Sequence, residues 1–238
     1  VSCPPCPAGH AAMRSITASQ NDNMIIIAYH IFNYAQANPV EKDGQKLSKY
    51  DFRTQDATDV ANSVLGGLGG MPEAAFDRTL YKDKHLSSRI EWHAAADARA
   101  AAQTTTPVNI HITSTYDATT LEATVRVKLA YTDDVNFKQT LTLAVIEDSI
   151  IDAEKYDDKI EKDYVHEHVL RDIVTPVTGV LIPAKVDPKV AGRVYERTFK
   201  VPIKTEWHAE HCKLVAFVSN DEPNNRDVVH TEEVHLIQ

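Results

Sequence analysis

The spacing of the hydrophobic residues changes near the middle of the chain, and this change limits the fold more than any other feature. From Pro107 onward apolar residues alternate with polar ones, which is the pattern of strands that bury one face. Short strands of this kind joined by polar turns are typical of an antiparallel β-sandwich. We therefore expect an immunoglobulin-like β-sandwich over residues 105–238, with strands near residues 108–112, 121–129, 141–145, 199–203, 214–218 and 234–236.

The first half of the chain mixes helices with strands. In order, we expect a helix at 7–20, a strand at 24–29, a helix at 56–65, the glycine-rich run 66–70, a strand at 74–77 and a helix at 86–103. This order predicts a thioredoxin-like α/β domain over residues 1–104, whose first strand lies outside the given sequence. With 238 residues, 43% of them hydrophobic, the chain can fill two cores, so an α+β protein of two domains is predicted.

A Cys-x-x-Cys pair, Cys3 and Cys6, stands at the predicted start of the first helix. The positive end of a helix dipole favours the thiolate, which is the species that attacks disulfides. Cys3 would attack, and Cys6 would resolve the mixed disulfide. Pro72 follows the glycine-rich run, at the place of the proline, usually preceded by a cis bond, that faces such a dithiol in thioredoxin folds. The pattern predicts a thiol–disulfide oxidoreductase site of Cys3, Cys6 and Pro72.

Two other interpretations of the cysteine pair stay open. An inert disulfide would close a four-residue loop, which stabilises a fold by only about 2 kcal/mol in a loop-length estimate. A zinc site would need two further ligands, and His10 supplies one of them. Three prolines near Cys3 also lack the backbone N–H that could stabilise its thiolate, so its pKa is expected to be lowered only modestly; they are Pro4, Pro5 and Pro7.

Charge and hydropathy exclude several classes of partner. The chain carries 34 acidic and 25 basic residues, a net charge of -9 spread along its whole length. We therefore expect no nucleic-acid partner and no basic surface for anionic lipid. The longest apolar stretch, residues 24–29, is far shorter than the roughly 20 residues that cross a bilayer. No cofactor is predicted.

Two histidine-containing segments are weaker candidates. In a strand, His166 and His168 would share one face, a spacing found in some metal sites, although a hydrogen-bonded polar face explains them as well. His208, His211 and Cys212 form a similar group, and Cys212 is expected to be buried because an apolar strand follows it. The acidic segment 147–163 has little pattern and is expected to be a long loop or a short helix.

Taken together, several motifs resemble the family related to the 28-kilodalton outer-membrane protein of Bacteroidetes. They are the segments 3–10, 70–72, 75–78, 164–171 and 214–218. The resemblance implies a lipoprotein or secreted protein of the outer membrane with a thioredoxin-like half and a β-sandwich half. It also implies that Cys3, Cys6 and Pro72 match the family's cysteine pair and post-glycine proline, and that any membrane association comes through a lipid anchor outside the given sequence.

Two functions are consistent with these features. In the first, the protein exchanges disulfides with other envelope or surface proteins, which the sandwich domain docks. In the second, it is a redox-inert surface binding or adhesion lipoprotein in which the thioredoxin-like half is a scaffold and the sandwich loops carry recognition.

Overall fold

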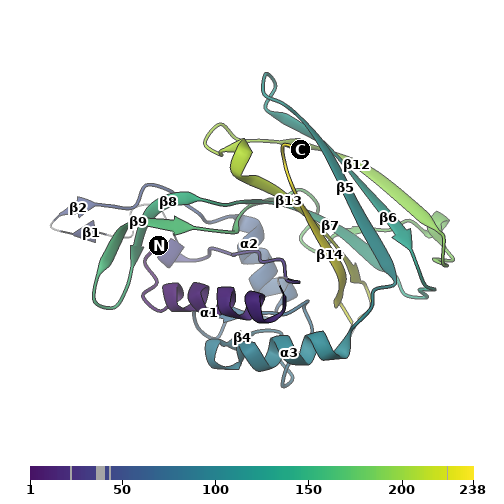
Figure 1. The fold of residues 1–238 in the computed structure, drawn as a ribbon, viewed down its shortest axis with the longest axis horizontal. Coiled ribbons are helices and arrows are strands. Elements are labelled where there is room, and N and C mark those ends of the chain that lie inside the picture. The colour runs from purple at the N-terminus through teal and green to yellow at the C-terminus, as the bar shows by residue number, and fades with distance from the viewer. Residues whose placement is uncertain (22, 36–40, 43, 224) are drawn as a thin grey trace. The chain divides into compact units, whose positions relative to one another are not determined.

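The computed structural model describes residues 1–21, 23–35, 41–42, 44–223 and 225–238, and the chain forms two compact units (Figure 1). Unit 1 consists of Val1–Ala102 together with Asp148–Arg171. Unit 2 consists of Gln103–Glu147 together with Asp172–Gln238. The first division follows Ala102. Residues 148–171, however, belong to unit 1, whereas the change in periodicity placed them in the second domain.

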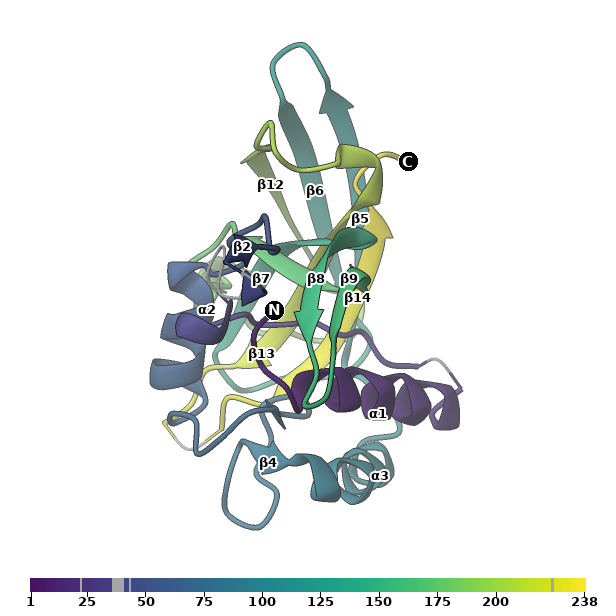
Figure 2. The same cartoon turned by 90° about the vertical axis from the view of Figure 1, so that its left-hand side faces the viewer.

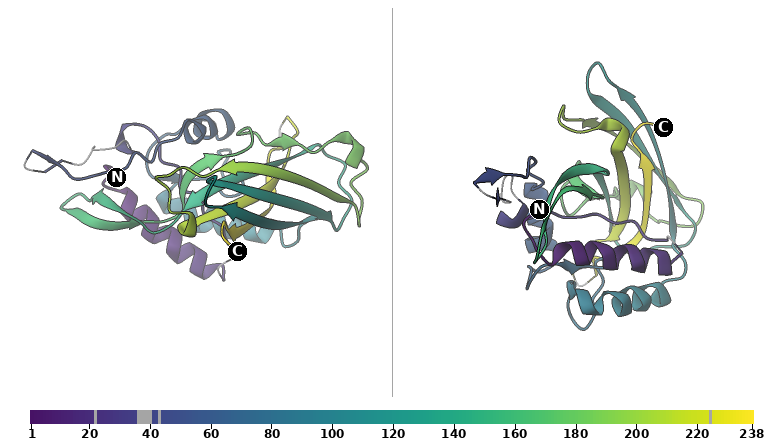
Figure 3. Two further views of the ribbon diagram at one scale, coloured as in Figure 1. Left: turned by 90° about the horizontal axis from the view of Figure 1, so that it is seen from above. Right: turned by 60° about the vertical axis from the view of Figure 1, so that its left-hand side comes forward.

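Unit 2 is built from two antiparallel sheets. One has the order β12-β6-β5, from β5 (Val108–Asp117), β6 (Glu122–Tyr131) and β12 (Val194–Pro202). The other has the order β10-β7-β13-β14, with β11 beside β7. Its strands are β7 (Gln139–Glu147), β10 (Val169–Ile173), β11 (Val180–Leu181), β13 (Cys212–Asn220) and β14 (Val228–His235). The first three residues of β10 are grouped with unit 1. The strands expected from the alternating pattern are all present (Figure 3).

One hydrophobic core joins the inner faces of these sheets. Val125, Val127 and Leu129 of β6 lie in the same buried cluster as Leu143 of β7 and Leu214 of β13. Alternate residues of β5 and β6 are buried, as expected for strands with one face toward the core. In β7 all nine residues are buried.

Unit 1 holds most of the helices and three two-stranded sheets. Its helices are α1 (Cys6–Ser19), α2 (Gln55–Asp59), which continues into a π-helical turn (Val60–Val64), and α3 (Trp92–Ala102). Its strand pairs are β1 (Glu41–Lys42) with β2 (Gln45–Lys46), β3 (Glu73–Ala74) with β4 (Ser87–Ser88), and β8 (Ile150–Lys155) with β9 (Ile160–His166). Short 3-10 helices cover Asn33–Ala35 and Arg89–Glu91 here, and Ala184–Val186 and Ala209–His211 in unit 2. Ile16 of α1 packs against Trp92 and Ala96 of α3.

The acidic segment is a β-hairpin, so the expectation of a loop or short helix there was wrong. Strands β8 and β9 pair in antiparallel register, with a shift between Asp152 and Glu154 (Figure 2). Ile150 and Ala153 of β8 pack in one cluster with Val1, Phe52 and Val169. The hairpin therefore supplies part of the core of unit 1.

Three expected elements are shorter than the sequence pattern suggested. Within residues 24–29 only Ala28 pairs, in a single parallel bridge with Val169. The strand expected at 74–77 ends at Ala74, because Asp77 and Arg78 adopt positive φ values of 51° and 57°, which turn the chain. The helix expected from residue 86 starts at Trp92 with a 3-10 turn before it, since Ser87 and Ser88 form strand β4.

Candidate functional site

Cys3 and Cys6 form a disulfide at the start of α1, with their Cα atoms 5.4 Å apart. Cys6 is the first residue of the helix, and Pro5 is its N-cap. The Cys6 N–H donates to the Cys3 carbonyl oxygen at 3.0 Å, so this N–H is used by the backbone turn. Cys3 is 6% exposed. The sequence thus correctly placed the pair at the N-terminus of a helix.

A groove lies beside the disulfide. Its volume is about 370 Å³, within the ~300–1,000 Å³ usual for small binding sites. Apolar side chains from two loops contribute to it, and one of them, Phe32, is 44% exposed. The groove is lined by Cys3, Pro4, Pro5, Phe32, Leu68, Gly69, Gly70 and Met71.

Pro72 lies next to this groove and against α1. The Met71-Pro72 bond is cis, as the pattern predicts. The ring approaches the helix closely at Gly9, which has no side chain. A Cβ atom on Gly9 would lie 2.8 Å from Pro72 Cγ and 3.2 Å from Trp92 Cη2. Met71 therefore lines the groove with Cys3, while the Pro72 ring packs on the second turn of α1.

His166 and His168 do not share one environment. His166 ends β9 and is fully buried, in ring contact with Phe52 at 4.9 Å and Tyr164 at 4.8 Å between centroids. His168 follows the strand with a φ of 59°, and its N–H donates to Asp148 Oδ1 at 2.6 Å. The left-handed backbone at His168 breaks the alternation that would have put both rings on one face.

The second histidine segment lies in unit 2. Nδ1 of the half-exposed His208 ring lies 3.0 Å from Oε1 of the buried Glu147. The backbone N–H of His208 donates to the same oxygen at 3.0 Å. Cys212 begins β13 and is fully buried, as predicted. Across the described part of the chain, no three His, Cys, Asp or Glu side chains are grouped so as to hold a metal ion.

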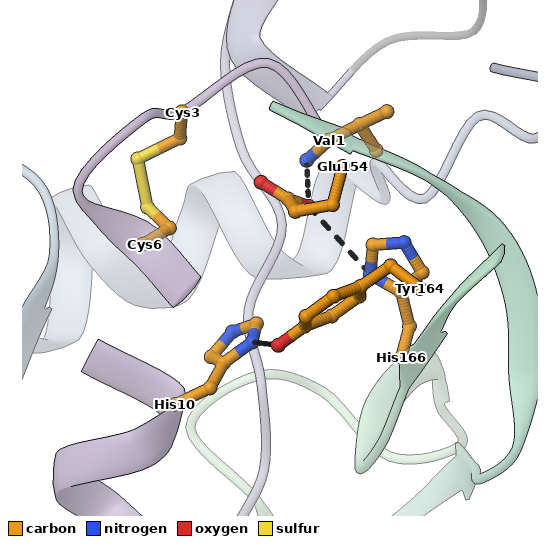
Figure 4. The surroundings of a disulfide bond; sticks show 7 residues. All are labelled: Val1, Cys3, Cys6, His10, Glu154, Tyr164 and His166. Carbon is orange, nitrogen blue, oxygen red and sulfur yellow. Dashed lines mark hydrogen bonds and ion pairs between the residues drawn. A yellow bond between two sulfur atoms is a disulfide. The ribbon is translucent and has the colours of Figure 1, made fainter. Parts of the chain in front are cut away.

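The structure also brings together buried and half-buried polar groups in an arrangement that the sequence did not indicate (Figure 4). Glu154 of β8 is 1% exposed, and its Oε2 accepts a hydrogen bond from the Val1 nitrogen at 2.9 Å. His166 Nδ1 lies 3.9 Å from the same oxygen. His10 of α1 contacts the Tyr164 hydroxyl through Nδ1 at 2.7 Å. We call Glu154, His166, Tyr164 and His10 the buried polar cluster.

Burial shifts the ionisation of this cluster. It lowers the pKa of His10 to about 4 and that of His166 to about 3, so both rings are neutral at pH 7. It raises the pKa of Glu154, and the nearby Asp152 carboxylate acts in the same direction, while the hydrogen bond from Val1 opposes both. The cluster therefore contains one carboxyl group that is harder to ionise than usual and two histidines that do not carry charge.

Three separate segments supply the cluster, which explains why the sequence did not reveal it. His10 could be noted only as a single metal ligand. Glu154 stands in a run of acidic residues, and such runs are usually solvated. Only the pairing of β8 with β9 and the docking of α1 bring these side chains together.

Among the solved structures to which the chain is similar, two come from Porphyromonas gingivalis. HBP35 of Porphyromonas gingivalis is 17% identical over 75% of this chain, with a TM-score of 0.61, and the chain spans 56% of the length of HBP35. A domain of the outer membrane lipoprotein Omp28 from Porphyromonas gingivalis is 18% identical over 56% of this chain and 89% of that domain, with a TM-score of 0.37. The likeness to HBP35 shows a shared fold.

Sequence comparison identifies the family. No curated protein sequence matches the chain. No helix in the described ranges is long and apolar enough to cross a membrane.

Residues 62–236 match the family described as Outer membrane protein Omp28, which confirms the resemblance carried by the motifs. The chain therefore belongs to the Omp28 family of outer-membrane proteins, which places it in the bacterial cell envelope.

Proposed function

We propose that this envelope protein exchanges disulfides with other envelope or surface proteins through Cys3 and Cys6. In this view unit 1 is a thioredoxin-like domain, unit 2 is an immunoglobulin-like sandwich that docks the partner, and a lipid anchor outside the given sequence holds the protein at the membrane. One observation carries the proposal: Cys3 lines a groove at the start of α1, so a dithiol and a binding surface for a substrate chain occur together.

The groove suits an extended peptide that carries a cysteine. Phe32, Leu68 and Met71 give it an apolar surface on which small hydrophobic side chains of a substrate would pack. Gly70 has no side chain, and a Cβ there would meet nothing within 4 Å, so a substrate main chain could approach the groove closely at this residue. A substrate sulfur held there would be positioned for exchange with Cys3.

The test is the reduction potential of the Cys3–Cys6 disulfide. The protein would be equilibrated in glutathione or dithiothreitol buffers, and its thiols would be trapped and counted by mass. We expect a potential above about -230 mV, in the range of known exchange catalysts. A potential below about -300 mV, or a disulfide that is reduced only when the protein unfolds, would contradict the proposal.

A second function, redox-inert binding, is favoured by the surroundings of Cys3. The prolines at positions 4, 5 and 7 lack an N–H, and the N–H of Cys6 is donated to the Cys3 carbonyl oxygen, so few donors remain for a Cys3 thiolate. Under this alternative the disulfide is a permanent part of a scaffold for adhesion or binding. The same titration separates the two functions, because a scaffold disulfide has the low potential.

A further inference from the structure

Strand β12 forms the outer edge of the three-stranded sheet of unit 2. Figure 2 shows β6 between β12 and β5, and β12 pairs with β6 along all nine of its residues. Within the part of the chain that the structure describes, no other strand pairs with β12. The free edge of a strand presents backbone N–H and C=O groups that can pair with a strand of another chain.

The hydrogen bonds at the two ends of β12 show which residues face this edge. The Tyr131 N–H donates to the Arg193 carbonyl oxygen at 2.9 Å, and the Ile203 N–H donates to the Leu121 carbonyl oxygen at 2.8 Å. In an antiparallel pair, the residues that bond one neighbour alternate along the strand. The backbone groups that point away from β6 therefore belong to Val194, Glu196, Thr198, Lys200 and Pro202. The missing N–H of the proline thus costs the pairing with β6 nothing, as is usual for a proline in an edge strand.

The exposed side chains of β12 are complementary to those of a second copy that runs antiparallel to it. With Thr198 on a twofold axis, Thr198 faces its own copy, and Glu196 faces Lys200 of the second copy. All three side chains are exposed. Opposite charges that face each other across two strands stabilise a sheet, and the twofold axis makes this pair occur twice.

Both charges already have a partner on β6, and these contacts leave them able to make another. Glu196 accepts from Arg126 at 2.6 Å, and Lys200 donates to Glu122 at 2.8 Å. All four side chains are at least 36% exposed, and ion pairs in water are weak. A second counter-charge across the edge therefore adds to these pairs without breaking a buried one.

The inward-facing side chains of β12 match in the same register. Tyr195 faces Val201 of the second copy, and both are buried apolar residues of the core of unit 2. Arg197 faces Phe199 of the second copy. Within one chain the Arg197 guanidinium already lies 5.2 Å from the centre of the Phe199 ring, so the same cation–π contact can form between the copies.

Other partners and other registers fit this edge less well. Charged residues on an edge strand generally hinder pairing with a neutral or apolar strand, since their charges would face no counter-charge. An antiparallel copy shifted by two residues would put Glu196 opposite Thr198 and Lys200 opposite Val194, and both charges would again lack a counter-charge. Only the register centred on Thr198 pairs both charges with opposite ones.

We propose that two copies of this chain associate edge to edge through β12, in antiparallel register about Thr198, so that the sheet continues across the twofold axis. One pair of strands is a small interface, and the association is therefore weak and depends on protein concentration. This self-association is a property of unit 2 and does not depend on the chemistry of Cys3 and Cys6.

The experiment measures association by sedimentation equilibrium from micromolar to near-millimolar concentration. We expect the wild type to pass from monomer to dimer. Glu196→Lys and Lys200→Glu each place like charges opposite one another, so each should weaken association by about tenfold or more. An equimolar mixture of these two variants has opposite charges at both positions and should form a heterodimer, which also shows that both variants are folded. Glu206→Lys, the same change at an exposed residue beyond β12, is the control and should associate like the wild type.

Cross-linking tests the register. Facing residues of an antiparallel sheet have Cα atoms about 4.5–5.5 Å apart, within the reach of a disulfide. Because Cys3 and Cys6 are bonded to each other and Cys212 is buried, an added cysteine on β12 is the accessible thiol. Under mild oxidation Thr198→Cys should link two chains, whereas Val194→Cys, which would face Pro202, should not.

Three results would overturn this interface. The first is a wild type that remains monomeric up to near-millimolar concentration. The second is a pair of charge variants that associate as strongly alone as they do when mixed. The third is cross-linking that is equally efficient at positions 194 and 198. None of these results concerns the reduction potential of the disulfide, so the proposed function stands or falls separately.

Discussion

The buried polar cluster has consequences for stability that belong to single residues. His166 is fully buried among aromatic rings, and His10 is held by the Tyr164 hydroxyl. Both rings have a native pKa far below the value of about 6.5 that they have in the unfolded chain. At a pH between the native pKa and the unfolded pKa of each ring, the unfolded state binds more protons than the native state. The contribution of these two histidines to the free energy of unfolding therefore falls as the pH drops below about 6.5, and it is constant above that pH.

This dependence can be tested by replacing one histidine. His166→Phe keeps the ring contacts but cannot bind a proton, so the slope of unfolding free energy against pH should decrease by about 1.4 kcal/mol per pH unit between pH 6 and pH 4.5. Urea unfolding followed by circular dichroism at several pH values measures the slope. His93→Phe, at an exposed position of α3, is the control. Equal slopes in the wild type and His166→Phe would show that His166 is protonated in the folded protein.

At this scale the sequence predicted the cysteine pair but not the carboxyl group. Two cysteines three positions apart are recognisable wherever they stand, since their chemistry depends on local spacing. Glu154, like Asp152, differs from the exposed acidic residues of this segment in being buried. Burial arises from the pairing of distant segments, and a single sequence does not show that pairing.

At the scale of elements, the close approach of α1 to the Pro72 ring depends on Gly9. A side chain there would meet Pro72 Cγ at 2.8 Å. We expect Gly9→Ala to destabilise unit 1 by about 1–3 kcal/mol, because overpacking outweighs the gain of up to about 1 kcal/mol in helix propensity. Urea unfolding measures the change. Gly70→Ala is a suitable control, because its Cβ would meet nothing within 4 Å. A more stable Gly9→Ala variant would mean that Pro72 moves away from α1 easily.

The elements also show where periodicity fails as a guide. In β5 and β6 the buried residues alternate, so the strands could be predicted. In β8 the pairing shifts between Asp152 and Glu154, and Asp152, Ala153 and Glu154 are buried in succession. A shifted register destroys the period of two, and two of the buried side chains are acidic. This strand therefore resembled a solvated loop in the sequence.

At the scale of the whole molecule, the chain crosses from one unit to the other more than once. It leaves unit 1 after Ala102, returns for residues 148–171 and ends in unit 2. A change in periodicity locates the first crossing, because helices give way to strands there. It does not locate the return, since the inserted hairpin consists of strands like its neighbours in sequence. Hence a change in periodicity along the sequence can indicate the first crossing and gives no sign of the second.

Because the hairpin of β8 and β9 belongs to unit 1, we expect it to open together with unit 1 and independently of the sheets of unit 2. Phe52→Ala removes a buried ring from the cluster that holds Ile150 and Ala153, at a cost of about 3–5 kcal/mol. Val125→Ala makes a cavity in the core of unit 2. Amide hydrogen exchange with mass spectrometry reports the opening of each segment. We expect Phe52→Ala to accelerate exchange in β8 and β9, and Val125→Ala to accelerate it in β5, β6 and β12 while leaving β8 and β9 protected. If Val125→Ala instead accelerated amide exchange in β8 and β9, the hairpin would unfold with the sheets that flank it in sequence. The grouping of residues 148–171 with unit 1 would then not describe the energetics of the protein.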